Sequence, residues 1–156
     1  MAQPVFPAQI AYDHNKGSYV EEYTPGTGTN EPFGYGDFVV LSGATVIRCG
    51  ADPAGILGIS EVVSGPAALI TPNGKVPIRV LNAEAVLTMC SSTVPVEATH
   101  LNNQYGIARD SSTGIWSVDV GDTSNKRVEV VRLNITEGIW YVKVIPAYLT
   151  NTGIVS

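Results

Sequence analysis

The chain has 156 residues and a mass of 16.5 kDa, which predicts one compact domain, with or without an extension, and excludes two large ones. Hydrophobic residues make up 44% and charged residues only 15%, enough apolar material for a core and too little charge for a disordered chain. The net charge of −5 argues against nucleic acid as a partner, because phosphate contacts need clustered Lys and Arg.

Residues 1–36 differ in composition from the rest of the chain. They hold four Pro and five Gly but few branched aliphatic residues, so they cannot bury enough apolar surface to fold alone. We therefore predict an extended N-terminal arm that docks on its own domain, a sister subunit or another protein. The alternative is one or two strands packed on the same domain. The predicted anchors are the aromatic residues of this segment, Phe6, Tyr12, Tyr19, Tyr23, Phe33 and Tyr35.

Residues 37–156 have the pattern of a β domain. Short β-branched runs alternate with turn residues, and no helical pattern lasts longer than a turn or two. The spacing predicts an all-β fold, either a small sandwich or a barrel. The expected strands are residues 37–41, 45–49, 56–63, 68–71, 76–81, 86–90, 104–109, 115–120, 126–133 and 139–145.

Three hairpins are expected among these strands. Asn73-Gly74 supplies the positive φ angles of a tight turn between residues 68–71 and 76–81. The two later hairpins each place a tryptophan two residues after a turn glycine, at Trp116 and Trp140. Period-two alternation puts both tryptophans on apolar faces, so we expect these two hairpins to lie side by side with both rings in one core.

Few residues offer chemistry. The two histidines are His14, expected on the surface of the arm, and His100, expected in a loop at residues 97–103. A nucleophilic triad of Cys90, His100 and Asp110 can be drawn, but no motif supports it. We therefore predict no catalytic residues, no cofactor and no metal site. Cys49 and Cys90 are too few and too far apart for a disulfide framework or a zinc site, and we expect both to be buried on strands.

The carboxylates have an ordinary structural explanation. Asp110, Asp122 and Glu137 lie among turn residues, where an acidic side chain caps its own backbone. Two carboxylates about 5 to 9.5 Å apart would be required for glycosidase chemistry, which the sequence does not exclude. Residues 119–125 match a calcium loop only loosely, and the sequon that begins at Asn134 is expected to start a hairpin turn.

No targeting or membrane segment is expected. The first eleven residues have neither a basic region nor an apolar one, and they contain Pro4 and Pro7. No run of 18 apolar residues occurs in the sequence, so a membrane-spanning helix is not expected.

The order and texture of residues 30–148 resemble the small capsid decoration, or cement, proteins of tailed bacteriophages. In these proteins a Pro-rich arm precedes a β domain that has a tyrosine-glycine strand and a hairpin with a turn Gly before a Trp. The segments that carry the resemblance are residues 31–40, 55–61, 74–80, 104–108, 110–119 and 140–145.

The resemblance implies a structural virion protein made in the host cytoplasm and bound to the outer surface of the capsid. Its partner would be the major capsid protein, and it would bind as a homo-oligomer, with a trimer favoured and a dimer possible. The N-terminal arm would clamp neighbouring capsid subunits. The alternative is a carbohydrate- or protein-binding β module, such as a phage fibre or tail component. Solvent-facing Trp116 and Trp140 would favour that alternative, and buried ones would disfavour a sugar platform.

Overall fold

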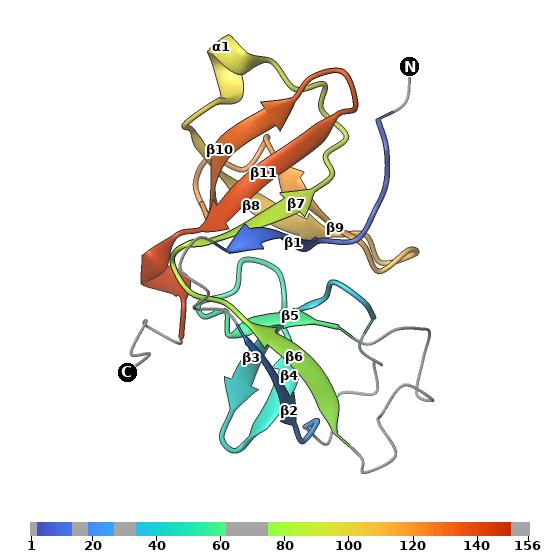
Figure 1. Ribbon diagram of the computed structural model, residues 1–156, viewed down its shortest axis with the longest axis vertical. Helices are drawn as coiled ribbons and strands as arrows, with labels where there is room; N and C mark the ends of the chain where they lie inside the picture. The colour runs from blue at the N-terminus through green and yellow to red at the C-terminus, as the bar shows by residue number, and fades with distance from the viewer. Residues whose placement is uncertain (1–2, 14–18, 27–33, 62–74, 151–156) are drawn as a thin grey trace.

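A computed structural model of the chain describes residues 3–13, 19–26, 34–61 and 75–150. These residues form two antiparallel sheets, one drawn above the other in Figure 1, which confirms the all-β prediction. The helical content of these residues is small. It consists of one α-helical turn, α1 (Glu97–His100), and one 3-10 turn at Pro146–Tyr148.

The larger sheet has six strands in the order β1-β7-β11-β10-β8-β9. A parallel bridge between Cys90 and Ser117, with a 2.9 Å bond from Val118 N–H to the Cys90 carbonyl, returns β9 to the end of β7. The sheet therefore closes into a small barrel. Its strands are β1 (Gln9–Asp13), β7 (Ala85–Met89), β8 (Gln104–Arg109), β9 (Trp116–Asp119), β10 (Val128–Asn134) and β11 (Ile139–Val144).

The smaller sheet has five strands in the order β2-β6-β5-β3-β4. It closes in the same way, because a parallel bridge joins Pro25, just after β2, to Val46 on β4. Two backbone bonds fix that bridge, from Gly26 N–H to the Val46 carbonyl at 2.8 Å and from Val46 N–H to the Thr24 carbonyl at 3.0 Å. Its strands are β2 (Tyr19–Tyr23), β3 (Phe38–Ser42), β4 (Thr45–Arg48), β5 (Gly58–Ser60) and β6 (Val76–Val80).

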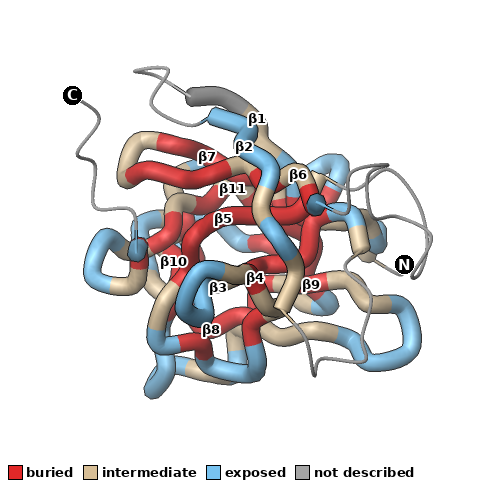
Figure 2. Tube along the Cα trace, turned by 90° about the horizontal axis from the view of Figure 1, so that it is seen from below, coloured by how far each residue is buried: buried red, intermediate tan, exposed pale blue. Residues whose placement is uncertain are grey.

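Two apolar cores fill the two barrels, and strand β3 lies between them. Adjacent residues of a strand point to opposite faces, so Phe38 packs in the larger core while Val39 packs in the smaller one. Phe38 meets the ring of Trp116 edge-on, with 5.3 Å between ring centroids. Buried segments from both sheets, red in Figure 2, gather in the middle of the molecule.

The first 36 residues contribute one strand to each sheet. Strand β1 pairs with β7, and β2 pairs with β6, both antiparallel. Residues 9–13 and 19–23 therefore form strands packed on the same chain, which is the alternative to an extended docking arm. The segment just before β1 is also seated, because Ala8 is fully buried in the larger core. Gly36, at φ +83°, leaves room for it, since a Cβ there would lie 2.6 Å from the Ala8 carbonyl oxygen.

The two tryptophan hairpins follow the sequence pattern. Strands β8 and β9 form one hairpin, β10 and β11 form the other, and β10 pairs with β8, so the hairpins lie side by side. Of the earlier predicted hairpin, β6 is confirmed, with Val76, Ile78 and Val80 on the buried face. Its partner at residues 68–71 and its turn at 72–74 lie outside the described residues.

Candidate functional site

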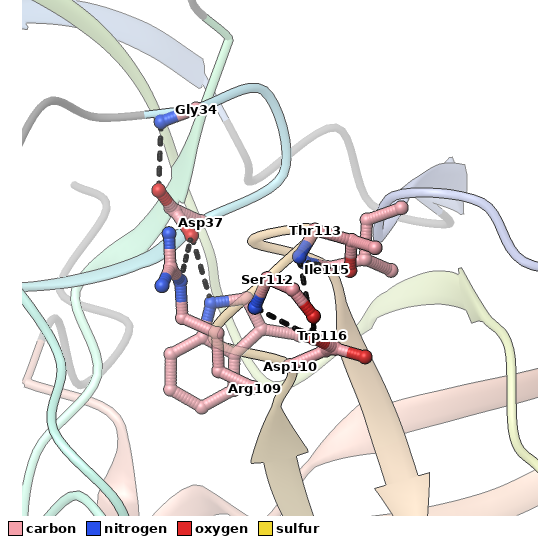
Figure 3. A network of polar contacts seen from close by, with 8 residues as sticks. All are labelled: Gly34, Asp37, Arg109, Asp110, Ser112, Thr113, Ile115 and Trp116. Carbon is pink, nitrogen blue, oxygen red and sulfur yellow. Dashed lines mark hydrogen bonds and ion pairs between the residues drawn. The ribbon is translucent and has the colours of Figure 1, made fainter. Parts of the chain in front are cut away.

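A buried carboxylate, that of Asp37, joins the two barrels. It stands directly before β3 and is fully buried. Its Oδ1 accepts bonds of 3.0 Å from Arg109 Nε on β8 and from the Trp116 indole N–H on β9, and its Oδ2 accepts the Gly34 N–H at 2.7 Å (Figure 3). These three donors come from both barrels and pair both carboxylate oxygens, so Asp37 links the two sheets.

Burial near Asp37 shifts the pKa values of two neighbouring side chains, Cys49 and Arg48. Burial, reinforced by the negative charge of Asp37, raises the pKa of the Cys49 thiol to about 12. Burial and then the positive charge of Arg109 lower the pKa of Arg48. Cys49 and Cys90 are both free and buried, as predicted, but each lies just after a strand, β4 or β7, and not within it. A protonated, buried thiol such as Cys49 is a poor nucleophile.

The structure does not assemble Cys90, His100 and Asp110 into a triad. The Cys90 thiol lies 3.6 Å from the Trp116 carbonyl oxygen, to which it donates. His100 Nδ1 accepts the backbone N–H of Val96, and Asp110 caps a turn. Each side chain is committed to a different local contact. His100 also lies on a helical turn, α1, where the sequence predicted a loop.

Two of the three predicted turn carboxylates cap backbone. Asp110 accepts the Ser112 hydroxyl and the N–H groups of Ser112 and Thr113 (Figure 3), and these bonds lower its pKa. Asp122 accepts the N–H groups of Asn125 and Ser124, which likewise lower its pKa.

The third carboxylate departs from the prediction. In the β10–β11 turn it is Asn134 whose side chain caps the backbone N–H of Glu137, while the Glu137 carboxylate accepts from the Asn134 amide. The reason is position, since Asn134 opens the turn and its short side chain reaches the N–H three residues on. The expected start of a turn at Asn134 is confirmed.

A groove of about 400 Å³ opens beside the β8–β9 turn. Its walls are the N-terminal segment, the end of β7 with the residues that follow it, and the turn itself. The Asp110 carboxylate in its wall accepts the backbone N–H groups of Ser112 and Thr113, so it is committed to the turn. The lining residues are Gln3, Pro4, Val5, Cys90, Ser91, Ser92, Asp110, Thr113, Ile115 and Ser117.

The predicted arm anchors divide into exposed and packed residues. Tyr19 and Tyr35 are 41% and 39% exposed. Phe6 is half-buried, and Tyr23 is half-buried against the smaller core, where burial and its 3.0 Å bond to Glu21 raise its pKa to about 12. The other two predicted anchors, Phe33 and the side chain of Tyr12, lie outside the described part of the chain.

The tryptophans test the sugar-platform alternative. Trp116 and Trp140 are 1% and 0% exposed and belong to the same core, as the alternation predicted. A sugar-binding platform needs a ring face open to solvent, so neither tryptophan can supply one.

Exposed aliphatic residues were missed by the sequence reasoning. Large aliphatic side chains are exposed to solvent in the segment before β1, in the segment after β7 and in the β10–β11 turn. The sequence Val94-Pro95-Val96 could have indicated this exposure. Proline has no backbone N–H and disfavours pairing in a sheet, so the two valines beside it are not buried by a neighbouring strand. The residues are Val5, Val94, Val96 and Ile135.

No protein-family description, curated protein or solved structure matches this chain. Within the described ranges, no group of three or more His, Cys, Asp or Glu could hold a metal ion. The same part of the chain contains no helix long and apolar enough to cross a membrane.

Proposed function

We propose that this chain is a structural virion protein, a cement or decoration protein that binds the major capsid protein lattice on the outside of a tailed phage head. Three features support the proposal. The sequence resembles such proteins over residues 30–148. The carboxylates of Asp37, Asp110 and Asp122 hold the joint between the barrels and two turns. Exposed aromatic residues are available for contact with a partner.

The observation that carries the proposal is the rigid presentation of Tyr19 and Tyr35. Tyr19 lies on β2, whose backbone is paired with β6. Tyr35 is held next to Gly36, whose N–H donates to the Ser60 carbonyl at 2.8 Å. Tyrosine buries a large area for few rotatable bonds, and a fixed backbone lowers the entropy cost of docking further.

On a capsid lattice, weak individual contacts are sufficient for tight binding of an oligomer. A homo-oligomer, with a trimer favoured and a dimer possible, presents several copies of the same contact to one shell, and its avidity exceeds that of a single contact. Because the protein binds the assembled lattice and not the dispersed subunits, binding adds to the stability of the shell. The N-terminal residues clamp neighbouring capsid subunits through their exposed rings.

The test measures mass and shell binding together. The solution mass is determined by light scattering, and the protein is then mixed with capsid shells that lack a decoration protein. We expect an oligomer that co-sediments to saturation and raises the melting temperature of the shell. A monomer that leaves the shell unchanged contradicts the proposal and favours the alternative, a β module that binds carbohydrate or protein.

Matched variants test the role of the tyrosines. The double variant Tyr19→Ala/Tyr35→Ala is expected to weaken co-sedimentation by about tenfold or more, because each buried interface tyrosine contributes about 1 kcal/mol or more. The control is Leu41→Ala, which changes a residue of similar exposure on β3. Equal binding by the double variant and the control would assign docking to another surface.

A further inference from the structure

His100 holds the segment of residues 91–96 to the larger barrel. Its Nδ1 accepts the backbone N–H of Val96 at 2.9 Å, and its own backbone N–H donates to the Val96 carbonyl at 2.8 Å. The ring thus takes the place of a helix cap, because α1 has no other side-chain cap at Val96. A nitrogen that accepts a hydrogen bond carries no proton, so the contact requires neutral imidazole.

The surroundings of the ring favour the neutral form. His100 is 5% exposed and packs on Trp140 from β11 and Tyr105 from β8, with ring centroids 5.0 and 6.0 Å away. Glu97 is the other ionisable residue of α1, and residues 91–96 and 101–103 contain none. Of the two strands packed against the ring, β8 carries Arg109 and β11 carries Lys143, and neither strand carries a carboxylate. Burial lowers the pKa of His100 below its ordinary value of 6.5.

We propose that His100 is a proton-sensitive latch, which holds residues 91–96 in place at neutral pH and releases them on acidification. A protonated imidazole carries N–H on both nitrogens, so it turns a donor toward the donating N–H of Val96. It also places a charge in an aromatic pocket with no carboxylate among its described contacts. The open segment relieves both effects, because solvent then hydrates the imidazolium.

Release changes the outer surface of the barrel. Residues 91–96 carry two exposed valines, Val94 and Val96, and two serines, Ser91 and Ser92, that line the groove. The start of the segment is tied separately, by the 2.8 Å bond from the Ser91 hydroxyl to the Val118 carbonyl. Opening therefore hinges after Ser91 and moves the valines, so any contact made through them is sensitive to pH.

The direction of the pH effect follows from linkage. The open segment leaves His100 with an ordinary pKa near 6.5, while the closed one has a lower pKa, so the open state binds more protons between the two values. The closed state is fully stabilised above 6.5 and loses stability as the pH falls below it. Between the two pKa values the opening equilibrium rises about tenfold per pH unit.

Amide hydrogen exchange tests the latch on the full chain. Exchange of the Val96 N–H, corrected for its intrinsic pH dependence, is followed from pH 8 to pH 5. We expect opening to increase below about pH 6.5 in the wild type and to be independent of pH in His100→Asn, whose amide oxygen accepts without titrating. The control is His14→Asn, which changes the other histidine of the chain and should titrate like the wild type.

A second measurement holds even if His100→Asn fails to fold. The ring nitrogens of His100 are titrated by NMR in the wild type, where the latch requires a neutral ring protonated on Nε2 and a midpoint that coincides with Val96 opening. A flat exchange profile for Val96 through that midpoint overturns the latch, as does a loss of pH dependence in His14→Asn.

Discussion

Asp37 shows how one residue fixes the relation between two sheets. It is fully buried, and its two oxygens accept from a loop N–H, an arginine of β8 and an indole of β9. The Asp37–Arg109 pair is 3.0 Å long and partly exposed on the arginine side only. An ionised carboxylate only accepts hydrogen bonds, so both of its oxygens suit the three donors around them. An amide side chain does not, because one of its two ends is a donor.

We expect Asp37→Asn to lower the free energy of unfolding by about 2–4 kcal/mol, because the new amide N–H₂ faces existing donors and leaves Arg109 without its counter-charge. Urea unfolding at 25 °C measures the change. The matched control is Glu61→Gln, which breaks the partly exposed Glu61–Arg79 pair and should cost less than about 1 kcal/mol. Equal losses in the two variants would remove the special role of Asp37.

At the scale of elements, local patterns identified most strands. The period-two alternation of the Trp116 and Trp140 segments fixed which residues face the core, and β8 was found with its exact ends. Strands β1 and β2 were left as one alternative of two, since their own residues alternate weakly. What makes them strands is the pairing offered by β7 and β6, which lie far along the chain.

The candidate surface was less accessible to sequence reasoning than the strands. Aromatic composition drew attention to the first 36 residues, yet nothing local distinguishes Tyr19, which faces solvent, from Tyr23, which packs on the smaller core. That difference depends on which face of β2 the neighbouring strands cover. The contact of His100 with Val96 was missed because a helical turn of four residues leaves no periodic signal.

Gly58 sets the distance between strands β5 and β6. A Cβ at this position would overlap the carbonyl oxygen of Arg79 on β6, which is backbone and cannot turn away. We expect Gly58→Ala to cost about 2–4 kcal/mol, because the strands must separate within the wall of the smaller core. Thermal and urea unfolding measure the loss.

The control for that prediction is Gly50→Ala, at a site where an added Cβ meets no atom within 4 Å. This variant is expected to change the free energy of unfolding by less than about 1 kcal/mol, because the added Cβ meets nothing and mainly reduces the entropy of the unfolded chain. A Gly58→Ala protein as stable as Gly50→Ala would mean that β5 and β6 do not approach as closely as described.

At the scale of the whole molecule, the two barrels share one buried interior. Strands β3 and β5 of the smaller sheet send Phe38 and Ile59 into the larger core, and Asp37 ties the same strand to β8 and β9. The N-terminal residues belong to this unit as well, because β1 completes one sheet and β2 the other. Residues 3–13 and 19–26 are therefore part of the fold, whatever partner the exposed rings meet.

Truncation tests whether the N-terminal residues belong to the folded unit. An N-terminal arm separate from a β domain of residues 37–156 would be removable without unfolding that domain. The structure leads to the opposite expectation, because deleting residues 1–13 removes Ala8 from the core and exposes the pairing edge of β7. We expect the truncated chain to melt about 6–20 °C lower, as a loss of about 3–5 kcal/mol implies for a chain of this size, and to aggregate more readily. Calorimetry measures the shift, and a synthetic peptide of residues 1–13 should restore part of it by pairing again with β7. An unchanged melting temperature would show that these residues add nothing to the folded unit.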